Sequence, residues 1–367
     1  MPLNYRKIGD LITKVSEKNK DGLYDEVLGV AIEKEFMPSV ANTIGTDLKK
    51  YNVIRKNRFA FNPMHVGRDE KLPIAVYHND EPALVSPAYF MFEVIDRDVD
   101  INYLMLVFKT ASFDHLCWFH TDASVRGGLT WDDFADIEVN IPSLEEQQTI
   151  VRQYKTITDR ICVLERINEE LNKQADCIFK EEIINSLEEF DEEPLDKNID
   201  FVNGLAMQRF RPKKNEKGIP VIKIRELSQG YCDGNSEYCR ISIDESHLIN
   251  NGDLVFSWSG SLKVDFWSGG LAGLNQHLFK VTSKRFYDWF SYLWVNHYLI
   301  DFQTTAKNKG TTFGHIKRED LTASMIKVPN NEQMKILDKK MKPIFDLIKI
   351  NSLELQQLRK LKAIVLP

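Results

Sequence analysis

Apolar residues follow a heptad spacing in two long stretches of the chain, and this spacing predicts two long amphipathic helices. Asn168 interrupts the first series and Asn351 interrupts the second. The apolar positions are Ile150, Tyr154, Ile157, Ile161, Leu164, Leu171, Ala175 and Ile178, and then Leu337, Met341, Ile344, Ile348, Leu355 and Leu358. A single asparagine in such a seam fixes the register of a coiled coil, so we expect the two helices to pair. Packing of each helix on its own domain is the alternative.

The two predicted helices begin in the same way. The sequence "IPSLEEQQTIV" occupies residues 141–151, and "VPNNEQMKIL" occupies residues 328–337. In each, a serine or asparagine suited to cap a helix precedes acidic residues that favour the first turn. The first helix, if unbroken over 144–187, spans about 65 Å at 1.5 Å per residue. Pro343 has no backbone donor and should kink or restart the second helix near Lys342.

The helix starts belong to a longer internal repeat. Pro142 and Pro329 lie 187 positions apart, about half of the 367 residues. Three upstream segments match in the same order, although a single strand-like match of this kind also arises by chance. They are 126–142 with 313–329, "SPAYFMFEV" (86–94) with "NQHLFKV" (275–281), and "NRFAFNP" (57–63) with "GDLVFSW" (252–258). The sequence therefore predicts an internal duplication, in which each copy is a β-rich module followed by a helix.

The repeat predicts an α+β fold with a pseudo-two-fold internal repeat. Two β-rich domains would be separated by two long α-helices paired as an antiparallel coiled coil, with Ile157, Ile161, Ile344 and Ile348 packed together in the seam. The expected boundaries are 1–143 for the first domain, 144–190 for the first helix, 191–329 for the second domain and 330–367 for the second helix.

Composition excludes several classes of protein. With 43% hydrophobic and 28% charged residues the chain is typical of globular proteins, and it has no apolar run long enough to span a membrane. The N-terminus lacks the apolar stretch of a signal peptide. The five cysteines form no CxxC pair, which favours neither a disulfide framework nor a zinc site. We therefore expect a reducing, cytoplasmic location.

The sequence contains no recognisable catalytic constellation. Neither a phosphate-binding GxxxxGK[ST] loop nor a GxGxxG dinucleotide motif is present. "FNPM" (61–64) lacks the second proline and the aromatic residue of amino-methyltransferases, and "SWSGS" (257–261) is not a GxSxG nucleophile motif. His115, Cys117 and His120 fit an apolar helix ending near a turn better than a zinc site. A binding protein is the main interpretation, and an enzyme with an unrecognised site is a minor one.

Charge adds a qualification to that interpretation. The formal net charge is −6, which by itself argues weakly against nucleic acid. Basic residues nevertheless gather in "LKKYNVIRKNR" (48–58) and "RFRPKKNEKGIPVIKIR" (209–225), while acidic residues gather elsewhere. Separate surfaces of opposite sign are therefore compatible with a DNA-binding role.

These motifs together resemble a known family. The two helix starts resemble its Pro-x-x-x-Glu-Gln-x-x-Ile stretch, and "GDLVFSWSG" (252–260), "NQHLFKV" (275–281) and "GTTFGHI" (310–316) resemble its module motifs. The chain is thus similar, over essentially its whole length, to the specificity subunits of Type I restriction–modification systems. The first module keeps the spacing and strand character of these motifs, but its residues at the motif positions are different.

The resemblance implies a DNA-reading subunit without its own catalysis or cofactor. It would read a bipartite, asymmetric site in double-stranded DNA and dock two methyltransferase subunits, through which restriction–translocase subunits join. S-adenosylmethionine, ATP and magnesium would belong to those partners, and no membrane is involved. An interaction adaptor, with two β-rich modules on a coiled coil that bind other proteins, is the alternative.

Candidate DNA contacts are polar, aromatic and basic residues in or beside the module motifs. Lysines and arginines suit phosphates, whereas tryptophan, glutamine and histidine suit base edges or stacking. A hairpin turn with a core tryptophan, or a solvated loop, is the structural alternative. The candidates are Arg68, Arg126, Arg209, Arg211, Lys213, Lys214, Ser257, Trp258, Ser259, Lys263, Gln276, His277, Lys307, Lys309, Thr311, Thr312, His315 and Lys317.

Overall fold

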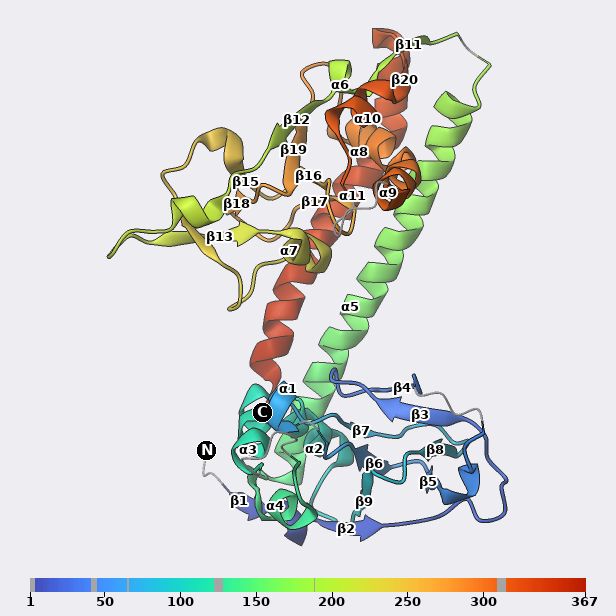
Figure 1. The fold of residues 1–367 in the computed structure, drawn as a ribbon, viewed down its shortest axis with the longest axis vertical. Helices are drawn as coiled ribbons and strands as arrows, with labels where there is room; N and C mark the ends of the chain where they lie inside the picture. The colour runs from blue at the N-terminus through green and yellow to red at the C-terminus, as the bar shows by residue number, and fades with distance from the viewer. Residues whose placement is uncertain (1–3, 41–44, 65, 122–127, 188, 309–314) are drawn as a thin grey trace. The chain divides into compact units, whose positions relative to one another are not determined.

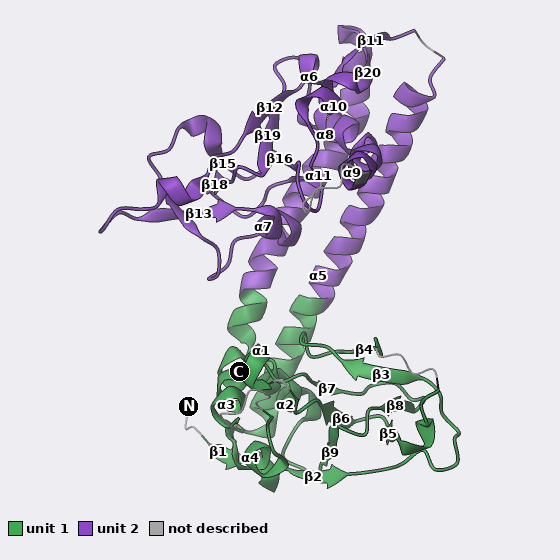
Figure 2. Ribbon diagram, viewed as in Figure 1, with its two compact units in different colours: residues 1–158, 361–367 green, residues 159–360 purple. Residues whose placement is uncertain are grey.

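The computed structural model describes residues 4–40, 45–64, 66–121, 128–187, 189–308 and 315–367. The chain forms two compact units, residues 1–158 with 361–367 (unit 1) and residues 159–360 (unit 2), which Figure 2 distinguishes by colour. None of the described helices is both long and apolar enough to cross a membrane.

The described residues of unit 1 form two four-stranded sheets and a two-stranded ladder. The sheets have the strand orders β2-β9-β6-β7 and β4-β3-β8-β5, and the ladder pairs β1 with β10. The strands are β1 (Tyr5–Lys7), β2 (Ile12–Val15), β3 (Val27–Val30), β4 (Phe36–Pro38), β5 (Asn52–Ile54), β6 (Arg58–Phe61), β7 (Ile74–Val76), β8 (Ala83–Val85), β9 (Phe90–Val94) and β10 (Glu138–Asn140).

Short helices with polar caps cover the first sheet of unit 1. The side chains of Asp100, Thr110 and Thr130 accept hydrogen bonds from the first-turn amides of α2, α3 and α4. Beneath them Phe59 stacks on Phe92, with ring centroids 4.7 Å apart. The helical segments are α1 (Val66–Asp69), α2 (Ile101–Phe108), α3 (Ala111–Phe119), α4 (Trp131–Asp136), η1 (Ile8–Asp10) and η2 (Leu48–Lys50).

Unit 2 repeats the same strand topology. Its sheets have the orders β12-β19-β16-β17 and β14-β13-β18-β15, and its ladder pairs β11 with β20. The strands are β11 (Asp191–Pro194), β12 (Asp200–Asn203), β13 (Gly218–Ile222), β14 (Tyr238–Arg240), β15 (Leu248–Ile249), β16 (Leu254–Ser257), β17 (Val264–Phe266), β18 (Ala272–Leu274), β19 (Leu278–Thr282) and β20 (Met325–Val328). The shorter helical segments are α6 (Leu195–Asn198), η4 (Met207–Phe210), α7 (Ile224–Gln229), η5 (Glu245–His247), α8 (Asp288–His297), α9 (Leu299–Asn308) and α10 (Arg318–Ala323).

The repeat predicted from the sequence is therefore present strand by strand, and the α+β fold class is confirmed. In both units one parallel pair, β3 with β8 and β13 with β18, lies within an otherwise antiparallel sheet. The registers also refine the sequence alignment. Phe59 lies opposite Phe92 in unit 1, and Phe256 lies opposite Phe279 in unit 2. Phe61 thus corresponds to Trp258, two positions away from the match suggested by the sequence.

The two long helices begin where their capping motifs predict. The Ser143 amide donates to the Glu146 carboxylate at 3.1 Å, and the Asn330 side chain accepts from the Gln333 amide at 3.0 Å. The helices are α5 (Leu144–Phe179), which continues into the π-helical turn η3 (Lys180–Ile184), and α11 (Asn331–Val365). The first helix therefore ends earlier than the expected residue 187, and α11 continues through Pro343 without the restart considered from the sequence.

Within unit 2 the two helices pair in antiparallel order (Figure 1). Going from Asn168 to Glu182 along α5 and η3, the partners fall from Asn351 to Lys340. Ile344 and Ile348 share a buried cluster with Ala175 and Phe179, with Leu171 packed against it.

The expected packing of Ile161 against Ile344 and Ile348 is wrong. Because the helices are antiparallel, the part of α5 that contains Ile161 lies beside residues of α11 that follow Ile348 in sequence. Arg160 forms an ion pair with Glu354 at 2.7 Å. Ile161 itself is buried, as the heptad pattern predicts.

Candidate nucleic-acid interface

Several of the predicted site residues meet at the end of strand β16 in unit 2. The Trp258 amide donates to the His277 carbonyl at 3.3 Å, and Ser259 forms a β-bridge with His315. The ring of Trp258 lies 5.8 Å from that of His277 and 6.2 Å from that of His315. We refer to Asn203, Trp258, Ser259, His277 and His315 as the Trp258 corner.

Hydrogen bonds fix the orientation of the Trp258 corner. The indole Nε1 of Trp258 donates to Asn203 Oδ1 at 3.2 Å, and Ser259 Oγ lies 3.0 Å from His277 Nδ1. His277 is exposed and Trp258 half-buried, while Gln276 Nε2 lies 3.3 Å from His277 Nε2. The corner therefore presents a ring face, an imidazole edge and an amide, which are groups that stack on or hydrogen-bond to bases.

Two serines of this motif have structural roles in the described chain. Ser257 is fully buried, and its hydroxyl donates to the Ser261 carbonyl across the turn. Ser259 is 6% exposed and holds the His277 ring. Ser257 thus shapes the turn, and Ser259 positions the histidine.

The predicted basic residues lie on separate surfaces. Lys307 lies in the last turn of α9, and Lys317 caps α10 through its backbone amide, which donates to Asp320; both side chains are exposed. Four more exposed side chains lie in the segment from η4 to the start of β13: Arg209, Arg211, Lys213 and Lys214. Arg126, Lys309, Thr311 and Thr312 lie outside the residues that the structure describes.

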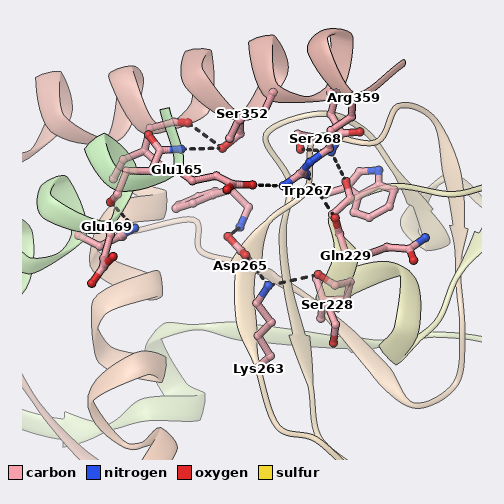
Figure 3. Close-up of a pocket in the computed structure, with 18 residues that line it drawn as sticks. Glu165, Glu169, Ser228, Gln229, Lys263, Asp265, Trp267, Ser268, Ser352 and Arg359 are labelled. Atoms are coloured by element: carbon pink, nitrogen blue, oxygen red, sulfur yellow. Dashed lines mark hydrogen bonds and ion pairs between the residues drawn. The ribbon is translucent and has the colours of Figure 1, made fainter. Parts of the chain in front are cut away.

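Lys263 belongs to a polar pocket rather than to the Trp258 corner. Its ammonium pairs with Asp265 at 2.9 Å and donates to the Leu227 carbonyl at 3.3 Å. Figure 3 shows this pocket of about 280 Å³, formed by α5, α7, α11 and the segment after β17. Across it Arg359 pairs with Glu165 at 2.8 Å. The hydrogen bond to Leu227 joins the β17 region to α7, so the structure favours a structural role for Lys263.

The corresponding corner of unit 1 has different chemistry. Phe61 and Phe90 take the places of Trp258 and His277, with ring centroids 5.3 Å apart. The Lys14 ammonium lies 4.4 Å from the Phe90 ring and 5.1 Å from the Trp131 ring. Lys14 lies opposite Phe92 as Asn203 lies opposite Phe279. A cation over aromatic faces in unit 1 thus replaces the amide and imidazole groups of unit 2.

Sequence reasoning missed both Lys14 and Asn203. They lie on strands far in sequence from the motifs, and the 187-residue alignment did not extend to those strands. Because β2 and β12 pair with β9 and β19, strand pairing was the signal that would have found them.

Other arginines of unit 1 are partly neutralised. Arg68 is exposed and pairs with its neighbour Asp69 at 2.7 Å, an interaction that raises the pKa of Arg68. Arg55 and Arg58 both bind the Glu17 carboxylate at 2.6 Å, and the hydrogen bond from Arg55 is the main cause that lowers the pKa of Glu17. The basic stretch 48–58 therefore offers DNA less charge than its composition suggests.

The His115 region forms a helix, as expected from the sequence. His115 and Cys117 lie on α3, and His120 is its C-cap. Cys117 is buried, and burial raises its pKa far above the usual range. Among the described residues, no three His, Cys, Asp or Glu side chains gather in a way that could hold a metal ion.

Comparisons with known proteins agree with this architecture. Residues 5–173 match the family described as Type I restriction modification DNA specificity domain. The chain is 25% identical over 309 residues to the Type I restriction enzyme MjaIX specificity subunit of Methanocaldococcus jannaschii, covering 75% of this chain and 69% of that relative. It is 24% identical over 166 residues to the EcoBI specificity subunit of Escherichia coli, covering 45% of this chain and 34% of that relative.

A solved structure shares the fold. The Type-I restriction-modification system S subunit from M. genitalium superposes with a TM-score of 0.55 at 15% identity, covering 99% of this chain and 95% of that chain. Two β-rich modules with duplicated topology, each followed by a long helix, are the architecture of this chain. The chain is similar to the specificity subunits of Type I restriction–modification systems, and its residues 5–173 match the DNA specificity domain of that family.

Proposed function

We propose that this chain reads a bipartite, asymmetric DNA site and docks two methyltransferase subunits, through which restriction–translocase subunits join. In this proposal residues 1–143 and 191–329 are the two recognition modules, and residues 144–190 and 330–367 are spacer helices. The chain itself needs no cofactor, because methyl transfer and ATP-driven cleavage belong to the partners. All five cysteines are free thiols, which supports a reducing, cytoplasmic location.

One observation carries the proposal: the same strand order occurs twice, with different side chains at the same corner. Equal topology gives each module an equivalent surface. The Lys14–Phe90–Trp131 group in unit 1 and the Trp258 corner in unit 2 would then read different bases. Two unlike half-sites follow, and exposed basic residues such as Arg209 and Lys214 would bind the flanking phosphates.

Module exchange tests this proposal. We would replace residues 191–329 by the corresponding module of a relative, express the chain with its methyltransferase, and map methylated adenines across the host genome. One half of the methylated sequence should change and the other should stay. A matched exchange of residues 1–143 should change the opposite half. If either exchange altered both halves, or neither, the modular interpretation would be refuted and the adaptor alternative favoured.

A further inference from the structure

The corner of unit 1 that corresponds to the Trp258 corner holds an exposed lysine, Lys14, against two half-buried aromatic rings. Its ammonium lies 4.4 Å from the centroid of the Phe90 ring and 5.1 Å from that of the Trp131 ring. The attraction of the rings for the cation restricts the lysine side chain. Because this side chain is also exposed, its N–H donors stay accessible to a ligand. We refer to Lys14, Phe61, Phe90 and Trp131 as the Lys14 corner.

The rings that hold Lys14 are themselves fixed in place. Trp131 begins α4, whose N-cap Thr130 accepts a hydrogen bond from the Asp133 amide at 3.1 Å. The Trp131 ring stacks on Phe61, which is fully buried, with ring centroids 6.4 Å apart. Phe90 lies opposite Phe61 on the neighbouring strand β9. A fixed support lowers the entropy cost of ordering the lysine when it binds a ligand.

The positive charge of Lys14 is not neutralised by the carboxylates that lie on the same strands. Glu93 of β9 pairs with Arg58 at 3.5 Å. Glu17, three residues after Lys14, pairs with both Arg55 and Arg58 at 2.6 Å. Within the part of unit 1 that the structure describes, none of the ion pairs involves Lys14. Its ammonium is therefore available to acceptor atoms of a ligand.

Unit 2 carries different groups at the same places in the fold. Asn203 takes the place of Lys14 in the strand register, and its side-chain oxygen already accepts from the Trp258 indole at 3.2 Å. Arg318 begins α10 as Trp131 begins α4, so an arginine replaces one of the rings that hold Lys14. The supported ammonium of the Lys14 corner thus distinguishes the first module from the second.

The chemistry of an ammonium group selects among the bases. It donates hydrogen bonds and cannot accept them. In the major groove, guanine offers two adjacent acceptors, O6 and N7, whereas adenine and cytosine each present an amino donor there and thymine offers one acceptor beside its methyl group. The Phe90 and Trp131 centroids lie 5.9 Å apart, so the corner is too broad for a minor groove about 6 Å wide. The major groove, about 12 Å wide, admits it.

We propose that Lys14 is a specificity-determining residue of the first module and reads a guanine through its O6 and N7 in the major groove. This inference rests on the proposed function and deepens it, because it names the base that one side chain reads. The half-site bound by residues 1–143 then contains a G·C pair at a fixed position. The other half-site is independent of Lys14.

Mapping of methylated adenines in hosts that express variants with the methyltransferase tests the inference. Lys14→Met removes the ammonium but keeps a side chain that packs on the rings, and Lys14→Arg keeps N–H donors. Lys20→Met removes another exposed lysine of unit 1 and is the matched control. The wild type, Lys14→Arg and Lys20→Met should share one bipartite motif. Lys14→Met should accept other bases at one G·C position of the half assigned to residues 1–143 by module exchange, and the other half should stay.

Binding measurements separate base reading from a phosphate contact. Fluorescence anisotropy would compare the mapped duplex with one in which A·T replaces that G·C pair, using the chain in complex with its methyltransferase. The wild type should bind the mapped duplex at least about tenfold more tightly. Lys14→Met should bind the two duplexes within about twofold of each other. Urea unfolding of Lys14→Met checks that the variant is folded.

Four results would overturn the inference. A folded Lys14→Met variant could keep the wild-type motif, or it could weaken both duplexes equally, which would make Lys14 a phosphate contact. A relaxed position that is an A·T pair would indicate minor-groove reading. A wild-type half-site for residues 1–143 without a G·C pair would exclude the inference whatever the variants do. These results leave the proposed function intact, whereas a wild type without a bipartite motif would refute both.

Discussion

Replacing Asn351 by leucine should destabilise unit 2, although the new side chain is more apolar and fits a heptad seam. Asn351 is 5% exposed, and its Nδ2 donates to Asn168 Oδ1 at 2.8 Å. The substitution leaves the Asn168 oxygen without this donor, at a cost of about 1–3 kcal/mol. Burial of the leucine offsets about 1 kcal/mol. The expected net loss is up to about 2 kcal/mol.

The double variant Asn168→Leu with Asn351→Leu should recover this loss. Removing both partners leaves no unsatisfied group, and apolar replacements of buried polar pairs are commonly neutral or stabilising by about 1 kcal/mol. The coupling energy between the two sites should therefore be about 1–3 kcal/mol. The nearby exposed pair of Arg160 and Glu354 provides a matched control cycle, because surface ion pairs couple by only about 0.2–1 kcal/mol.

Urea unfolding followed by tryptophan fluorescence measures these changes. Four of the six tryptophans lie in unit 2, so this signal reports mainly on that unit. The Asn351→Leu variant should lower the urea concentration at the unfolding midpoint by about 0.5 M. A double variant whose loss of stability equals the sum of the losses of the Asn168→Leu and Asn351→Leu variants would refute the role of the asparagine pair.

The purified chain should neither methylate nor cleave DNA, and turnover by a contaminant-free preparation would contradict this. Ile161→Glu should lower the free energy of unfolding by about 3 kcal/mol or more, because it places a charge at a buried aliphatic position. A melting curve equal to that of the wild type would argue against helix pairing there. Trp258→Ala should relax discrimination at particular base pairs by about 1–3 kcal/mol, whereas Lys214→Ala should weaken all sequences alike and reduce the salt slope by about one, as measured by titrations over a series of salt concentrations. Hydrogen bonds from Arg225 lower the pKa of Asp233 from 3.8 to about 2. The stabilisation that they give the folded state is present above pH 4, is lost as pH falls through 2, and amounts to about 1 kcal/mol after solvent screening. Arg225→Gln should return the pKa of Asp233 toward 4 in a carboxyl NMR titration.

The long helices were largely predictable because their signals are local. A capping residue, an acidic first turn and a heptad seam lie next to one another in sequence, and each acts over one or two turns. The end of α5 was not predictable in this way. Its π-helical turn at Lys180–Ile184 brings Ile183 into the buried cluster with Trp294, which is a tertiary contact that no local pattern encodes.

The strands show the same division between local and distant information. Alternation identified β6 and β16, but Phe59 and Phe61 are both aromatic, so the sequence could not decide which of them corresponds to Phe256. Strand pairing decided it. Three residues of the module motifs, Trp258, His277 and His315, lie in one region. Whether a motif residue faces outward depends on its place in the sheet, and Ser257 faces the core.

The short ladders that join the first strand of each module to its last affect how the chain folds during synthesis. Tyr5 lies opposite Asn140, and closing so long a loop costs about 4 kcal/mol of chain entropy. The first module has all of its strands once β10 has emerged from the ribosome. The core of unit 2 also needs Met341 and Ile344 from α11, so its completion waits for the last part of the chain. The nascent protein thus carries a closed first module and an open second one for about 10–45 s, an interval in which unpaired strand edges are exposed to aggregation or to chaperones.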